Sequence, residues 1–128
     1  MSNLIRIFKS KWFSKWAKKE KLTDKQLHKT ICEMSDGLVG NDLGKSIFKK
    51  RIAIQGQGKN GGFRSLIAYK VKDKAFFVYG FSKSVKSNVS TNELKALQVL
   101  AENLLEHSDK TLKQLIELKE LSEVQDYE

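Results

Sequence analysis

IFKKRIAIQGQGKNGGFRSLIAYKVKDKAFFVYGF, residues 47–81, is the most regular part of the chain. Its β-branched and aromatic residues form three runs, at 47–54, 63–71 and 75–81, which predict three strands. The short link 72–74 predicts a hairpin between the last two strands, and the loop 55–62 predicts another between the first two. We therefore expect an antiparallel meander, to which the apolar run at 4–8 adds a fourth strand.

Helical patterns lie on both sides of this sheet. Apolar residues at helical spacing predict a helix over 10–20 and a second one that begins at a Thr23 cap, with Leu27, Ile31, Met34 and Leu38 on its buried stripe. After the sheet, Ser90 and Glu93 form a capping box, and Asp109 is the predicted cap of a last helix. The expected fold is α+β: a meander sheet with two N-terminal helices and C-terminal helices.

Length and composition narrow the class of protein. With 128 residues the chain fits one domain, residues 1–128. One cysteine excludes an internal disulfide framework, and two histidines beside it make a zinc site improbable, so we expect no metal and no cofactor. No apolar run approaches the length of a membrane span or the core of a signal peptide. The expected location is the cytoplasm, away from membranes.

The charge is distributed unevenly along the chain. Residues 1–89 contain 20 Lys and Arg against 6 Asp and Glu, whereas residues 90–128 contain 4 against 9. The balance is thus +14 in the first part and −5 in the second. A basic body of this kind favours a polyanionic partner such as nucleic acid. The alternative is that the lysines only keep the surface soluble.

Two stretches of the sequence resemble nucleotide-binding motifs in their spacing, but the residues around them do not fit a nucleotide site. Gly56, Gly58 and Gly61 satisfy G-x-G-x-x-G, but a strand pattern follows them where a dinucleotide site needs a helix. The sequence 44–46, GKS, imitates the end of a P-loop, but position 39 holds valine instead of the required glycine. We expect a hairpin loop at the first and no phosphate-binding helix at the second.

Cations concentrate around the predicted sheet. Three of them lie on the first long strand, two at the glycine-rich loop and two after the third strand; they are Lys49, Lys50, Arg51, Lys59, Arg64, Lys83 and Lys86. Glycines beside Lys59 let the backbone approach an anion closely. A phosphate site and a merely lysine-decorated hairpin are both consistent with this spacing.

In order and spacing, these residues resemble the RelE-type toxins of bacterial type II toxin–antitoxin modules, within the RelE/ParE superfamily and its HigB-like branch. The similarity lies in KKRIAIQGQGKNGGFRSLIAYKVKDKAFFVYGFSKS at 49–84, with its G-x-G-K-x-G-G-[FY]-R loop, and in KWFSKWAKKEKLTDKQL at 11–27. DGLVGNDLGKSIFKKR at 36–51 and SNVSTNELKALQ at 87–98 fit the same branch. The resemblance covers about residues 5–107.

The resemblance implies a compact microbial ribonuclease-type fold and a translation-blocking endoribonuclease that cuts mRNA, usually in the ribosomal A site. It also implies a cognate antitoxin, commonly a helix-turn-helix protein in this branch. Such a site needs neither metal nor histidine, because Lys, Arg and Tyr can stabilise the phosphate and move protons. Two alternatives stay open: a ParE-like gyrase poison, and a nucleic-acid-binding module without catalysis.

The resemblance also suggests roles for individual residues. Arg64 matches the sheet arginine that contacts the scissile phosphate, and Lys83 matches the basic position opposite it. Arg51 is a further catalytic candidate, and alternation puts it on one strand face with Lys49 while Lys50 points the other way. Lys49, Lys50, Lys59 and Lys86 are the candidate RNA and phosphate ligands. Tyr79 is either a proton donor or, since alternation groups it with Phe77 and Phe81, a core aromatic.

Overall fold

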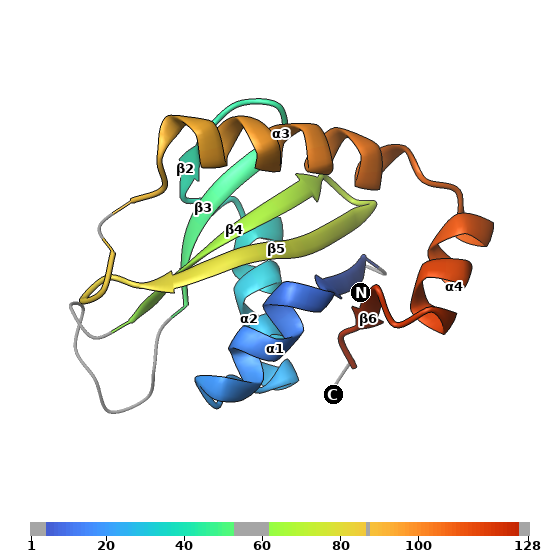
Figure 1. Cartoon of the computed structure of the whole chain (residues 1–128), viewed down its shortest axis with the longest axis horizontal. Helices are drawn as coiled ribbons and strands as arrows, with labels where there is room; N and C mark the ends of the chain where they lie inside the picture. Colours follow the sequence, from blue (N-terminus) through green and yellow to red (C-terminus); the bar gives the residue numbers. More distant parts are fainter. Residues whose placement is uncertain (1–4, 53–61, 87, 126–128) are drawn as a thin grey trace.

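The computed structural model describes residues 5–52, 62–86 and 88–125. The elements follow in the order β1 (Arg6–Ser10), α1 (Lys11–Lys19), α2 (Asp24–Ser35), β2 (Asn41–Asp42), β3 (Ile47–Ile52), β4 (Phe63–Lys70), β5 (Lys74–Ser82), α3 (Thr91–Glu106), α4 (Asp109–Glu117) and β6 (Leu121–Glu123). Figure 1 shows helices on both sides of one central sheet. The predicted α+β class and the three central strands are confirmed.

The sheet extends beyond the predicted meander. Its strand order is β2-β3-β4-β5-β1-β6, and β3, β4 and β5 form the antiparallel meander at its centre. The predicted fourth strand, β1, is present but runs parallel to β5, so the sheet is mixed. The sequence analysis missed β2 and β6, which contain two and three residues. Strands this short depend on pairing with a neighbour, and periodicity does not detect them.

The first layer of helices covers one face of the sheet with a continuous apolar core. Phe13 and Ala17 of α1 and Leu27, Ile31 and Met34 of α2 pack there against buried strand residues. Thr23 caps α2 as predicted, and its hydroxyl accepts a hydrogen bond from the Gln26 amide. The stripe ends earlier than expected: Leu38 lies beyond the end of α2 and is 62% exposed.

The second layer consists of α3 and α4 on the opposite face. Ala101 and Leu104 of α3 and Leu112 of α4 belong to a second core, together with sheet residues such as Leu66, Phe76 and Val78. The capping box of Ser90 and Glu93 begins α3 as predicted. The cap of α4 is Ser108, whose hydroxyl accepts from the Thr111 amide, and the predicted Asp109 is the first helical residue. Figure 1 shows α3 lying across this face.

Neither rejected nucleotide motif opens a helix. The strand β4 follows the G-x-G-x-x-G glycines, which lie outside the described residues. At the P-loop imitation, Gly44, Lys45 and Ser46 all have positive φ angles in the turn that joins β2 to β3. This left-handed turn leads into a strand, and it therefore lacks the helix N-terminus that a P-loop needs.

Candidate nucleic-acid interface

Two arginines face each other at the end of the central hairpin. Arg51 of β3 pairs directly with Arg64 of β4, and Arg64 in turn pairs with Phe81 of β5. Directly paired residues share one face of a sheet, and like charges in such positions repel. The next pair on this face, Lys49 and Leu66, identifies it as the face under α3, because Leu66 belongs to that core. The arrangement therefore favours a bound anion between the arginines.

Alternation along β3 separates its cations as predicted. Lys49 and Arg51 lie on the face under α3, and Lys50 lies on the other one. There the Lys50 Nζ is 2.9 Å from a carboxylate oxygen of Glu33 in α2, and its side chain is only 12% exposed. Because Lys50 is already neutralised on the opposite face, the structure separates it from the other predicted RNA ligands.

Arg64 has donor capacity that the fold does not use. Its Nη1 is buried and has no hydrogen-bond partner among the described residues. A buried guanidinium nitrogen without an acceptor is costly, and such atoms call for an explanation in a native structure. A phosphate oxygen is the acceptor that matches guanidinium geometry.

A glycine makes room for the other arginine. A Cβ at Gly62 would lie 3.0 Å from the Arg51 Nε and 2.9 Å from the Ile52 carbonyl oxygen. Gly62 is the last glycine of the loop pattern and directly precedes β4. Because Gly62 has no side chain, the Arg51 side chain can lie against the start of β4, the strand that carries Arg64.

A β-bulge decides the position of Tyr79. Leu66 pairs with Tyr79 and Ile67 pairs with Phe77, which leaves Val78 as an extra residue in β5. The extra residue inverts the alternation that follows it. Tyr79 consequently packs against the α3 core, while Phe77 belongs to the core under α1 and α2. The predicted grouping of Tyr79 with Phe77 is wrong; Tyr79 is half-buried, and the bulge puts it on the same face as Arg64.

The Tyr79 hydroxyl belongs to a small polar cluster with Lys86 and Glu93. The Lys86 Nζ donates to the hydroxyl at 3.3 Å and lies 2.7 Å from both carboxylate oxygens of Glu93. The hydrogen bond from Lys86 lowers the pKa of Glu93 to about 2, and the hydrogen bond to Glu93 raises the pKa of Lys86. Lys86 is therefore neutralised by Glu93, as Lys50 is by Glu33, and the ion pair fixes its ammonium beside the Tyr79 hydroxyl.

Trp12 completes the cluster from the first helix. Its ring stacks on Tyr79 with centroids 4.6 Å apart, and the side chain is 46% exposed. The sequence contains no local pattern that predicts this contact or the Lys86–Glu93 ion pair. The capping box identified Glu93 as a helix-capping residue. Its ion pair with Lys86 depends on the turn after β5, which brings Lys86 next to it.

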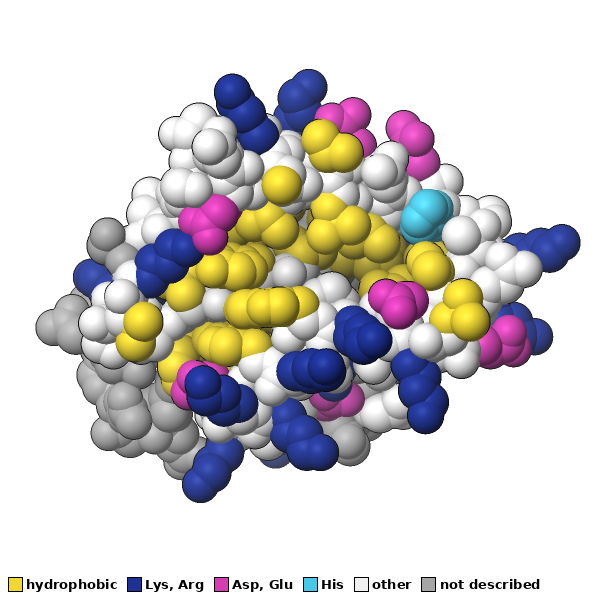
Figure 2. Space-filling view, in the orientation of Figure 1, with side chains coloured by type: hydrophobic (Ala, Val, Ile, Leu, Met, Phe, Trp, Pro, Cys, Tyr) yellow, Lys and Arg dark blue, Asp and Glu magenta, His cyan; other side chains and the backbone are white. Residues whose placement is uncertain are grey.

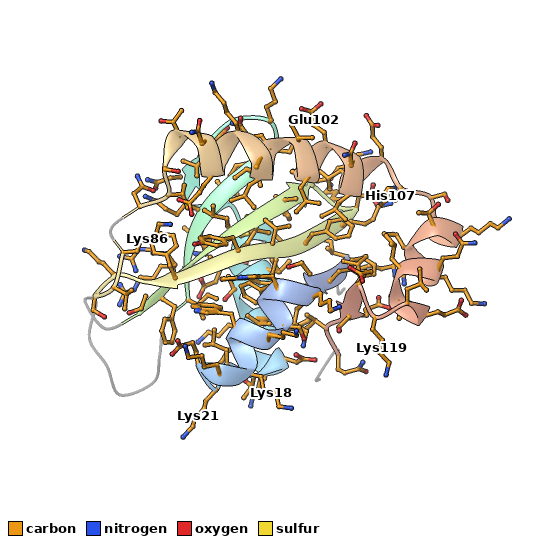
Figure 3. The ribbon with its side chains drawn as sticks, in the orientation of Figure 1. Lys18, Lys21, Lys86, Glu102, His107 and Lys119 are labelled. Atoms are coloured by element: carbon orange, nitrogen blue, oxygen red, sulfur yellow. The ribbon has the colours of Figure 1, made fainter. Side chains whose placement is uncertain are left out.

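The remaining predicted site residues lie near the end of the sheet that carries Arg51 and Arg64, or outside the residues that the structure describes. Lys83 is exposed in the turn that follows β5. The last residue of β5, Ser82, pairs with Phe63, the neighbour of Arg64 in β4, so Lys83 lies near Arg64. Figure 3 shows Lys86 at the same end of β5 and His107 at the far end of α3. Lys59 lies outside the described residues.

Within the described ranges, no three His, Cys, Asp or Glu side chains are grouped as metal ligands, and no helix has the length and hydropathy to cross a membrane.

Comparison with known proteins gives one family. The model of the RelE toxin of the RelE / RelB toxin–antitoxin system matches residues 5–124, nearly the whole chain. No curated protein matches the chain at a significant level.

Proposed function

Because this chain belongs to the RelE toxin family, we propose that it is an endoribonuclease that cleaves mRNA on the ribosome and so blocks translation. The family makes it a toxin with an antitoxin partner. We further propose that this antitoxin is a helix-turn-helix protein, as in the HigB-like branch that the sequence resembles. The observation that carries the proposed activity is the Arg51–Arg64 pair with its unused buried donor.

The proposed reaction needs only the RNA and the side chains of the protein. The 2′-hydroxyl gives its proton to a lysine amine or to water and attacks the neighbouring phosphorus, the bond to the 5′-oxygen breaks, and that oxygen takes up a proton from a side-chain donor. The products are a 2′,3′-cyclic phosphate and a free 5′-hydroxyl. The transition state has extra negative charge on the phosphate, and donors positioned beforehand stabilise it most effectively.

The two arginines would bind the scissile phosphate. The guanidinium of Arg64 can hold two phosphate oxygens at once, and the opposed Arg51 adds a second charge from the neighbouring strand. The repulsion between them falls when the phosphate binds, and it falls further as negative charge develops. Lys49 and Lys83 would extend the basic surface along the RNA backbone, and Lys59, outside the described residues, stays a predicted phosphate ligand.

Tyr79 is the proposed proton donor to the leaving 5′-oxygen. Its hydroxyl accepts a hydrogen bond from Lys86, which leaves the hydroxyl proton for another acceptor. Glu93 holds the Lys86 ammonium in place, and so fixes the orientation of this hydroxyl. General acids of this kind contribute ~10²–10⁴-fold. Tyr79→Phe keeps the Trp12 stack and removes only the hydroxyl, so it should slow cleavage by roughly that factor.

The test is brief induction of the toxin in cells, followed by primer extension on translated mRNA. Wild type should produce cuts in coding regions, and the Tyr79→Phe protein, at equal abundance and melting temperature, should produce far fewer. Comparing free mRNA with mRNA on purified ribosomes tests the ribosome requirement. Growth arrest with DNA breaks and intact mRNA would identify a gyrase poison instead, and binding to RNA without any cut would identify a non-catalytic module.

A further inference from the structure

Trp12 is an aromatic residue that the core does not enclose. Among the Trp, Tyr and Phe side chains within the described ranges, it is the only exposed one, at 46%. Large aromatic side chains stabilise a fold mainly through the apolar area that they bury. An open ring therefore calls for a reason other than core packing, and the proposed chemistry does not use it.

The Trp12 ring is held in place although it is exposed. It stacks on Tyr79 with an interplanar angle of 23°, and on Trp16, one helical turn away, with centroids 6.2 Å apart. Trp16 in turn meets the Phe63 ring edge-on at 5.3 Å, and Gly80 leaves room for the Trp16 ring. A ring that is fixed in advance can bind a flat partner with little further loss of conformational freedom.

The stacked pair lies close to the arginines along the sheet. Tyr79 pairs with Leu66, and Arg64 is two residues before Leu66 on the same face of β4. Two residues of a strand span about 7 Å. This span is comparable to the spacing of neighbouring phosphates in an extended RNA strand. A phosphate bound at Arg64 would thus place an adjoining base near the stack of Trp12 on Tyr79.

A groove beside the stack provides the space for a base. It has a volume of about 730 Å³, and Trp12 and Tyr79 line it together with aliphatic side chains of α3. Figure 2 shows apolar side chains in a band across the middle of the molecule, with Lys and Arg side chains beside it. The groove is continuous with the candidate interface, because Tyr79 belongs to both.

Cations flank the open ring on α1. Lys11 and Lys15, one residue before and three residues after Trp12, are exposed and line the same groove. Glu120 lies 3.9 Å from Lys11, so Lys15 is the better ligand for an RNA phosphate. Proteins bind single-stranded nucleic acid with this combination: bases stack on aromatic rings, and cations contact the backbone.

We propose that Trp12 is a stacking platform for an RNA base next to the scissile phosphate, with a preference for purines. Stacking strengthens with ring overlap, and the two rings of a purine overlap the indole more than one ring does. The platform gives the site a base preference that the arginines cannot supply, because phosphate contacts carry no base information. This subsite deepens the proposed function, since it requires an RNA substrate; it does not require that the RNA is cleaved.

Oligonucleotides that cannot be cleaved test the platform without relying on catalysis. The probes are 2′-fluoro hexamers of adenine, of uracil and of abasic units, which have no 2′-hydroxyl to attack. Wild type should bind the adenine hexamer at least about fivefold more tightly than the abasic one, with the uracil hexamer between them. Trp12→Leu should bind all three within about twofold of one another, and Trp12→Phe should keep part of the preference.

Val99→Ala is the matched control, because Val99 is 59% exposed on α3 and is not among the groove-lining residues. It should keep the full preference for adenine. Equal binding of the adenine and abasic hexamers by wild type, or a preference that persists in Trp12→Leu, would overturn the platform. Loss of the preference in Val99→Ala as well would show a general effect of the substitutions and would also overturn it.

Fluorescence provides a second measurement if Trp12→Leu lowers the melting temperature. The adenine hexamer should quench the tryptophan emission of wild type. It should leave the emission of Trp12→Phe unchanged, because the one indole that remains, Trp16, is partly buried against Phe63. Quenching that survives in Trp12→Phe would contradict stacking on Trp12. The proposed function fails separately, if translated mRNA stays intact after induction, whatever the hexamers bind.

Discussion

Lys50 and Arg51 are neighbours on β3, yet the two faces of the sheet treat them differently. On the face under α1 and α2, Lys50 lies against Glu33 and is nearly buried. On the face under α3, Arg51 lies opposite another arginine. One face therefore neutralises its cation within the fold, whereas the other leaves two positive charges side by side. The difference distinguishes a cation that is neutralised within the fold from a pair of like charges that a bound anion would stabilise.

Glycines on the two faces repeat the contrast. A Cβ at Gly80 would come 2.3 Å from the Trp16 ring, which fills that space in the core under α1 and α2. A Cβ at Gly62 would meet the Arg51 side chain and the Ile52 carbonyl instead. The first glycine makes room for an apolar ring and the second for a cation. Stability and activity should consequently depend on different faces.

The largest effect is expected at Arg64. Arg64→Ala should lower single-turnover cleavage by on the order of 10²-fold or more, about 3 kcal/mol in the barrier, because it removes the phosphate ligand. The melting temperature should stay the same or rise, since the mutation also removes a like-charge neighbour of Arg51. Arg64→Lys should restore little, because lysine lacks the two-pronged geometry.

The matched control for Arg64 is Lys50→Ala on the other face. It should leave cleavage per folded molecule unchanged and lower stability by on the order of 1 kcal/mol, since Glu33 loses its partner. Cleavage and melting temperature are measured on the same preparations. A folded Arg64→Ala protein with near-normal cleavage, or one whose loss only follows its melting temperature, would erase the contrast between the faces.

The two glycines provide a test of intermediate size. Gly62→Ala should shift Arg51 and lower cleavage roughly tenfold, since small misplacements of a positioning group are costly. Gly80→Ala should push Trp16 out of place and cost about 1–3 kcal/mol of stability. The corresponding fall in melting temperature is roughly 3–6 °C for each kcal/mol. Thermal scans and cleavage assays on both variants check this, and a reversed pattern would refute our assignment of the faces.

The smallest effect concerns Glu93, the acidic side chain that forms an ion pair with Lys86 on the face of the sheet under α3. Its pKa falls from 4.5 to about 2 because of the hydrogen bond from Lys86. A lowered folded-state pKa stabilises the protein above the unfolded value and loses that contribution as the pH falls from about 4.5 to 2. Glu93→Gln keeps a capping-box side chain and should therefore flatten the acid dependence of the melting temperature in this window.

Lys86→Gln should flatten the same window, because it removes the main cause of the pKa shift. Melting curves at several pH values between 6 and 2 measure both variants against wild type. An acid dependence equal to that of wild type in either variant would show that the ion pair does not hold in solution. Lys86 would then be a cation of this face that the described fold does not neutralise.

Local interactions explain why much of this molecule was predictable. The caps Thr23 and Ser90 act on amides three residues further along, so a short pattern contains all the atoms involved. The division of Lys49 and Arg51 from Lys50 follows from strand pleating alone. The cap of α4 was misplaced by one residue because Ser108 and Asp109 are both good caps, and only the observed bond to Thr111 distinguishes them.

Features that depend on distant parts of the chain were not predictable. The bulge at Val78 arises from pairing between β4 and β5, and it turns Tyr79 to the face of Arg64. The stack of Trp12 on Tyr79 joins residues from α1 and β5, and β6 exists through its pairing with β1. The sequence determines which residues are strands, helices and cations, because those properties are local. The relative placement of those cations and aromatics depends on sheet register and helix packing, which only the whole folded chain establishes.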